Sequence, residues 1–172
     1  MKHPPPKRYN FEHQKQLGLQ GEARLDSFFS RWYLIKEVPM ELQREGVDRF
    51  FVPRWGEVEF PRLVEYKTDF HASGNAFIET HSVIRIGQDT IKGWLYTSKA
   101  DWLVYFMAAY ETAFVLNFES LRRFVIQWEA EQLCRHRECI NSNYKSSGLI
   151  VPLPLMLRAS RAIFKVEYCS KF

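Results

Sequence analysis

Apolar residues near the start of the chain recur at helical spacing. Gly18, Glu22, Leu25 and Phe29 follow one another at three- and four-residue steps. Residues at these steps share one face of a helix, so the pattern predicts a helix over residues 12–31. One member of this face, Glu22, is a carboxylate. We therefore expect an acidic side chain on the side of the helix that faces the rest of the protein.

Shorter apolar runs predict strands between this helix and a second one. The second helix is predicted over residues 119–133, where apolar residues keep the same period. Residues 84–100 give no clear pattern, and the polar residues 141–148 predict a loop. The order of elements predicts an α/β domain with a central mixed β-sheet flanked by helices. The predicted strands cover residues 32–38, 47–52, 62–68, 76–81, 102–108, 112–118 and 162–168.

Length and composition fit one domain of ordinary size. The chain has 172 residues, 46% of them hydrophobic, so residues 11–172 are predicted to form a single domain with a packed core. Residues 1–10 are Pro-rich and basic, which predicts a flexible arm rather than a signal peptide. No run of about 18 apolar residues is present, so no membrane span is expected. Three cysteines, an odd number, favour reduced thiols and a cytoplasmic location.

Charge is unevenly distributed along the chain. The formal net charge is +4, but residues 1–120 carry 15 basic and 16 acidic side chains, whereas residues 121–172 carry 9 basic and 4 acidic ones. A basic balance favours an anionic partner without identifying it. The function of the acidic side chains in the first part then depends on where they lie in the fold.

The third predicted strand carries two charged side chains on one face. Glu65 and Lys67 point to the same side because strand side chains alternate, while their apolar neighbours point into the core. A hairpin between the second and third strands would bring Asp48 roughly opposite Tyr66, close to both charged residues. Glu22, on the inner face of the first helix, would reach the same place. The pattern thus predicts a cluster of three carboxylates and a lysine.

Three carboxylates on one sheet repel one another unless a cation lies among them. Mg²⁺ suits such a cluster because it takes oxygen ligands and keeps several waters. A bound ion of this kind activates water and neutralises charge on a phosphoryl group under attack. Lys67, two residues after Glu65, would orient the water, lower its pKa or stabilise the transition state. The cluster therefore favours phosphodiester hydrolysis, and the alternative is that Glu65 and Lys67 form a solvated ion pair on an exposed sheet.

The order of these residues resembles that of the PD-(D/E)XK nucleases, and especially archaeal-type Holliday junction resolvases and related phage endonucleases. The resemblance covers about residues 18–108, and it departs from the family in having Val47 where a proline is common before the aspartate. Further segments look like those of uncharacterised phage and bacterial members of the superfamily. The segments that carry the resemblance are Glu22, Gly46-Val47-Asp48, Glu65-Tyr66-Lys67-Thr68-Asp69, Gly74-Asn75-Ala76-Phe77-Ile78-Glu79 and Lys99-Ala100-Asp101-Trp102.

This resemblance implies a restriction-endonuclease-like core and a metal-dependent DNA endonuclease. Glu22, Asp48 and Glu65 would hold Mg²⁺, with Mn²⁺ as a substitute, and Lys67 would serve the attacking water. The substrate would be DNA, including branched DNA or DNA of phage and recombination pathways. Many relatives form homodimers, so a homodimer is compatible with the pattern. No membrane partner and no small-molecule cofactor are expected.

Other residues are candidates for supporting roles. Glu79 would lie beside the metal if its strand neighbours the third strand, or else would pair with Lys67 or cap a loop. Asn75 is either a turn residue or a contact to the phosphate backbone. Several basic residues and one tryptophan are candidate DNA contacts. The alternative is scattered solubilising charge for the basic residues and a cover for the sheet edge for the tryptophan. The candidates are Lys2, Lys7, Arg8, Trp94, Lys99, Arg122 and Arg123.

Two alternatives of other kinds stay open at this point. Cys134, His136 and Cys139 are either half of a zinc site or ordinary residues near a helix end. At the level of the whole protein, a non-catalytic DNA-binding protein on the same fold would keep basic residues without needing clustered acids. A structural or regulatory subunit would use aromatic side chains, 16% of the chain, at a protein interface.

Overall fold

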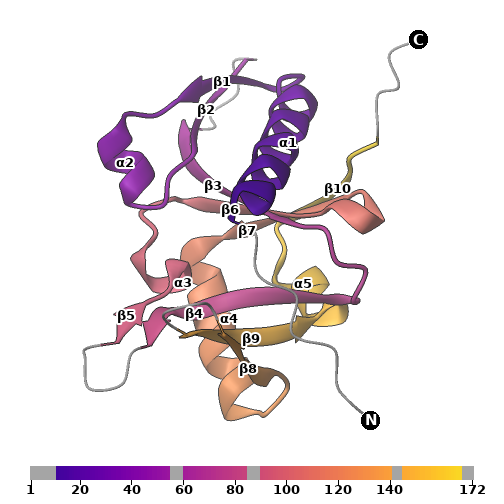
Figure 1. Cartoon of the computed structure of the whole chain (residues 1–172). Coiled ribbons are helices and arrows are strands. Elements are labelled where there is room, and N and C mark those ends of the chain that lie inside the picture. The colour runs from indigo at the N-terminus through magenta and orange to yellow at the C-terminus, as the bar shows by residue number, and fades with distance from the viewer. Residues whose placement is uncertain (1–10, 55–59, 85–89, 141–144, 168–172) are drawn as a thin grey trace.

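The computed structural model describes residues 11–54, 60–84, 90–140 and 145–167, which form two β-sheets and the helices packed on them (Figure 1). The first sheet has the strand order β1-β2-β3-β6-β7-β10. Only β3 and β6 are parallel among its neighbouring pairs, so the sheet is mixed, as the sequence predicts. Its strands are β1 (Tyr33–Glu37), β2 (Arg49–Pro53), β3 (Arg62–Asp69), β6 (Trp102–Met107), β7 (Thr112–Asn117) and β10 (Ala162–Lys165).

Helix α1 (Phe11–Phe29) covers one face of this sheet. Leu25 and Phe29 are buried in one cluster with Tyr66 of β3, so the predicted inner face of the helix is confirmed. The helix approaches β3 closely at Gly21, where an added Cβ would lie 2.7 Å from the Cγ2 atom of Thr68. The glycine therefore lets α1 lie directly on the strand that carries the candidate site.

A second, four-stranded antiparallel sheet lies on the opposite side of the first sheet from α1 (Figure 1). Ile78 and Leu149 of this sheet share a buried cluster with Leu103 of β6. Strand β6 is consequently buried along its whole length, which explains its continuous apolar sequence. The strands of the second sheet, in spatial order, are β5 (Ile91–Lys92), β4 (Asn75–Ile84), β9 (Lys145–Pro152) and β8 (Arg135–Ile140).

The remaining elements are short except for α4. Asn117 caps α4, because its side-chain oxygen accepts a hydrogen bond from the Ser120 backbone N–H at 2.9 Å. In the described part of the chain, no helix is long and apolar enough to cross a membrane. These elements are α2 (Met40–Arg44), α3 (Trp94–Thr97), the 3₁₀ helix η1 (Ala108–Tyr110), α4 (Phe118–Ala130) and α5 (Leu153–Ala159).

Both predicted helices and all predicted strands are present, with ends shifted by a few residues. Two predictions about their surroundings were wrong. The strand over residues 76–81 lies in the second sheet and not in the central one. Residues 145–148, predicted as loop, begin β9, because the small Ser146 and Gly148 are buried between β4 and β8. The rest of that predicted loop, 141–144, lies outside the described residues.

Candidate functional site

Strand β3 places Glu65 and Lys67 on the face turned away from α1. The carboxylate of Glu65 is almost fully buried, with 1% of the residue exposed, and its Oε1 lies 2.6 Å from the Lys67 Nζ. Its neighbours Val64 and Tyr66 pack on the α1 side, as strand alternation predicts. The interpretation of Glu65 and Lys67 as a solvated surface pair therefore fails for the glutamate.

The second oxygen of Glu65 is buried without a hydrogen-bond partner. The nearby Ser98 hydroxyl donates to the Gly46 carbonyl at 2.8 Å and is already engaged. Gly46 has a φ of +74°, and a Cβ there would lie 3.2 Å from Glu65 Oε2 and 3.1 Å from Ser98 Cα. Burial raises the pKa of the Glu65 carboxyl, while Lys67 and, after it, the nearby Ser98 hydroxyl act against that rise. A buried acceptor with no donor is destabilising, and a catalytic role or a bound ion is one explanation for such a group.

Asp48 lies just before β2, next to Glu65. The strand ladder pairs Arg49 with Val64, so Asp48 is opposite Glu65, one residue away from the predicted position opposite Tyr66. Its backbone N–H donates to the Val64 carbonyl at 2.8 Å, and its Oδ2 accepts from the Tyr66 N–H at 2.7 Å. Two hydrogen bonds to β3 therefore hold Asp48 at the end of the hairpin.

Glu22 lies on the other side of β3 from Glu65 and Lys67, because α1 covers the Tyr66 face. Its Oε2 accepts a hydrogen bond from Arg49 at 3.0 Å, and Arg49 also binds Asp26 at 3.0 Å. Burial, followed by repulsion from Asp48, raises the pKa of the Glu22 carboxyl. Asp48 thus links the two halves of the predicted cluster, and Glu22 does not itself contact Glu65 or Lys67.

Substitution of Arg49 should show how much its ion pairs with Glu22 and Asp26 contribute to stability. We expect Arg49→Met to lower the free energy of unfolding by about 1–3 kcal/mol, because two half-buried carboxylates, Glu22 and Asp26, lose their cation. Urea denaturation measures the change. The control is Arg44→Met on the exposed side of α2, for which a change below about 0.5 kcal/mol is expected. Equal losses in the two variants would contradict the structural role.

Glu79 approaches Lys67 from the second sheet. Burial raises the pKa of its carboxyl, opposed by a hydrogen bond from the Trp94 backbone and by the charge of Lys67. Desolvation acts to lower the pKa of Lys67, but the charges of Glu65, Asp48 and Glu79 together raise it. Strand β4 does not neighbour β3, so Glu79 reaches the cluster across the space between the sheets and not along one sheet. Lys67 therefore remains protonated among three carboxylates.

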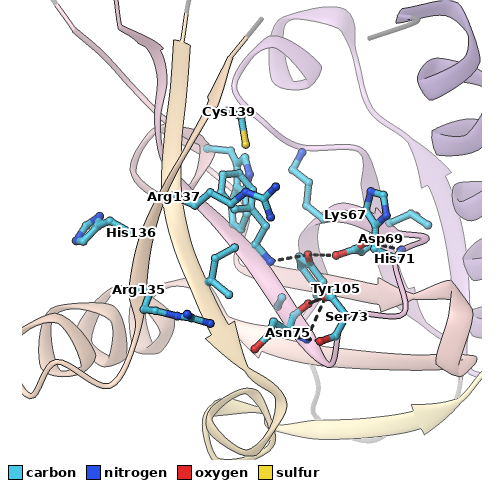
Figure 2. Close-up of a pocket in the computed structure, with 15 residues that line it drawn as sticks. Lys67, Asp69, His71, Ser73, Asn75, Tyr105, Arg135, His136, Arg137 and Cys139 are labelled. Atoms are coloured by element: carbon cyan, nitrogen blue, oxygen red, sulfur yellow. Dashed lines mark hydrogen bonds between the residues drawn. The ribbon is translucent and has the colours of Figure 1, made fainter. Parts of the chain in front are cut away.

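A groove of about 830 Å³ extends from Lys67 between the two sheets (Figure 2). Arg135 and Arg137 reach into it from β8, whereas His136 points to the other side of that strand. From the sequence, these arginines belong to a wider basic set in the C-terminal part, for which phosphate contacts and scattered solubilising charge were both open, and no strand was predicted over residues 135–140. The signal was their spacing, since residues two apart on a strand share a face, but a charged segment after a helix gives no apolar pattern that marks it as a strand.

Tyr105 joins the two sheets at the floor of the groove. Its hydroxyl donates to Asp69 Oδ2 at 3.2 Å and accepts from the Phe77 N–H at 2.9 Å (Figure 2). The other Asp69 oxygen accepts from the His71 N–H at 2.8 Å. Asn75, also on the groove wall, donates from its side chain to the Ser73 carbonyl at 2.8 Å, which makes it a turn residue.

The other candidate DNA contacts have different surroundings. Trp94 lines the groove, with the Lys67 Nζ 5.7 Å from its ring centroid. Arg122 donates to the carbonyls of Leu95 and Ser98, both at 2.8 Å, and so holds the end of α3. Lys99 and Arg123 are exposed, and Arg123 is paired with Glu119. Lys2, Lys7 and Arg8 lie outside the described residues.

Whether the site can bind a metal depends on how the carboxylates of Glu22, Asp48 and Glu65 are arranged. Asp48 and Glu65 supply adjacent carboxylates, and the unpartnered Glu65 oxygen fits the oxygen-ligand chemistry of Mg²⁺. Within the described residues, no group of three acidic, histidine or cysteine side chains is already spaced as a metal site. Glu22 is bound to Arg49, and Glu65 to Lys67.

The half zinc site considered for Cys134, His136 and Cys139 does not converge. Cys134 precedes β8, and residues 136 and 139 on this strand differ by an odd number of positions, so their side chains face opposite ways. His136 Nε2 lies 3.2 Å from a carboxylate oxygen of Glu129. The three residues are therefore ordinary surface and packing residues beside the end of α4.

Comparison with known proteins adds no family assignment. The chain matches no protein-family model, no curated protein and no solved structure. Any functional conclusion therefore depends on the chemistry of the residues described above.

Proposed function

We propose that this protein is a metal-dependent DNA endonuclease of the PD-(D/E)XK type, with a restriction-endonuclease-like core. The proposal rests on the buried Glu65, which has one unpartnered oxygen and one oxygen bound to Lys67. A structural ion pair gains nothing from a buried orphan oxygen, which costs free energy. Asp48 and Glu79 add negative charge around the same lysine, and the groove beside it is rich in basic side chains.

Each residue of the cluster has a role in this proposal. Asp48 and Glu65 would hold Mg²⁺, and Glu22, held by Arg49 on the other side of β3, would add negative charge beside Asp48. When bound, the ion supplies a water of lowered pKa and neutralises charge on the phosphoryl group. Lys67 keeps its proton because three carboxylates surround it, and its N–H groups would orient the attacking water or a phosphoryl oxygen.

Removal of divalent metal provides the direct test. We expect the purified protein to cut at least one of branched, duplex and single-stranded DNA in Mg²⁺ or Mn²⁺, and to lose at least about a thousandfold in rate in EDTA. Single-turnover cleavage of labelled DNA measures the rate. Cleavage at the same rate in EDTA, or no cleavage of any of the three substrates with either metal, would refute the proposal.

A non-catalytic DNA-binding protein is the second candidate. One observation favours it, namely that Lys67 and Arg49 already neutralise Glu65 and Glu22 within the chain. Titration calorimetry with Mg²⁺ and Mn²⁺ separates the two candidates. DNA binding together with no measurable metal affinity would support the binding protein, whereas a metal affinity lost in Glu65→Gln would support the nuclease.

A further inference from the structure

One face of the second sheet runs from Glu79, one of the carboxylates around Lys67, to the edge strand β8. Glu79 of β4 pairs with Gly148 of β9, and Gly148 pairs with Arg137 of β8. Paired residues on neighbouring antiparallel strands share a face, so Glu79 and Arg137 point to the same side. Because Gly148 has no side chain, nothing from β9 stands between them at this position.

The next row across the same face has the same order. Phe77 of β4 pairs with Ile150, and Ile150 pairs with Arg135. This row lines the groove together with Arg137 (Figure 2). The groove thus has an arginine rim along β8, an apolar middle, and Lys67 at its far wall.

Among the residues that the structure describes, the two arginines differ from their neighbours on β8 in having no ion-pair partner. On the opposite face of β8, His136 pairs with Glu129, and Glu138 pairs with Lys145 at 2.9 Å. In the described part of the chain, neither Arg135 nor Arg137 forms a salt bridge, and both are exposed. Two like charges on one strand face repel each other, and an anion between them would relieve that repulsion.

The wall opposite the arginines offers a surface for bases. Trp94 lines the groove beside Lys67, and its ring is half-buried. Asp69 is the acidic residue on this wall, and the Tyr105 hydroxyl and the His71 N–H both donate to it. Basic rims with an aromatic wall are the arrangement with which proteins hold single strands.

We propose that Arg135 and Arg137 bind the phosphate backbone of a single-stranded DNA segment, which lies in this groove against Trp94 and leads to Lys67. The inference rests on the proposed nuclease function and names its substrate. The volume of the groove, about 830 Å³, is in the size range of pockets that hold small molecules. A groove of this size has room for a few nucleotides of a single strand but not for a duplex. The single strand would be a flap, gap or end of a larger DNA.

The test measures binding in EDTA, where cleavage is not expected. Fluorescence anisotropy compares a short labelled single strand with the blunt duplex of the same sequence, over a range of salt concentrations. We expect Arg135→Ala/Arg137→Ala to weaken single-strand binding about tenfold or more, and to reduce the salt slope by about 1.4. The control Arg44→Ala/Arg158→Ala removes the same charge from exposed helix positions, and a change below about threefold is expected.

Two outcomes would overturn the inference: equal weakening in both double variants, or tighter binding of the duplex than of the single strand by the wild type. Cleavage assays on the same proteins keep this inference separate from the nuclease proposal. If metal-dependent cleavage requires Glu65 but single-strand binding is unchanged in Arg135→Ala/Arg137→Ala, only the inference fails. If the arginines are required for binding and no cleavage occurs with any metal, only the nuclease proposal fails.

Discussion

Glu65→Gln and Lys67→Met are each expected to lower the rate of Mg²⁺-dependent DNA cleavage by about a thousandfold or more. Glutamine keeps the shape of Glu65 but loses the negative charge needed for a metal ligand. Methionine keeps most of the length of Lys67 but has no N–H groups for water or phosphoryl oxygen. Single-turnover rates at saturating metal measure both effects, so that weaker metal binding does not hide a slower chemical step.

The matched control is Glu41→Gln on α2, an exposed position where the same change should leave the rate within about twofold. A rate within threefold of wild type for Glu65→Gln would show that the catalytic centre is elsewhere. A loss of rate that only follows unfolding would be equally damaging, so each variant is also unfolded in urea.

A double variant separates a catalytic pair from a structural one. Glu65→Leu/Lys67→Met removes both charges from the 2.6 Å pair and also removes the unpartnered oxygen. Apolar replacement of a buried ion pair is often neutral or stabilising. We therefore expect this variant to be inactive but as stable as the wild type, whereas a pair retained for stability would give a markedly weaker fold.

Local periodicity was sufficient to place Glu65 and Lys67. Strand alternation depends only on backbone geometry, and it separates these residues from Val64 and Tyr66 whatever the register of the hairpin. The position of Asp48 was one residue off, because hairpin register depends on the connecting loop and not on the strands alone.

Strand periodicity could not predict the second sheet. Strand β8 is an edge strand with mostly exposed and polar residues, so no apolar alternation marks it. Near the start of its partner β9, Ser146 and Gly148 are buried because they are small. Because β8 and β9 were not predicted, the net positive charge of residues 121–172 did not show which of its basic side chains share a face. Sheet register is needed to see that Arg135 and Arg137 share a face with Glu79.

Gly148 is the residue on which this shared face depends most, and its replacement should have the largest effect on stability. A Cβ at this position would meet the Ile78 carbonyl oxygen and would lie 2.8 Å from Phe77 Cζ and 2.9 Å from Glu79 Cα. Two of these three neighbours are backbone atoms of β4, which cannot rotate away as a side chain can. We expect Gly148→Ala to lower the free energy of unfolding by about 2–4 kcal/mol.

Gly18→Ala on α1 is the matched comparison, since an added Cβ there would have no neighbour within 4 Å. The same methyl group should raise stability by about 1 kcal/mol at this helical position, because alanine has the higher helix propensity. Urea denaturation of both variants therefore should give changes of opposite sign. If Gly148→Ala were as stable as wild type, β4 and β9 would be able to separate at this point, and the spacing between Glu79 and the arginine rim would not be fixed by the sheet. Reduced single-strand binding in Gly148→Ala, measured where it is still folded, is the result expected if that spacing matters.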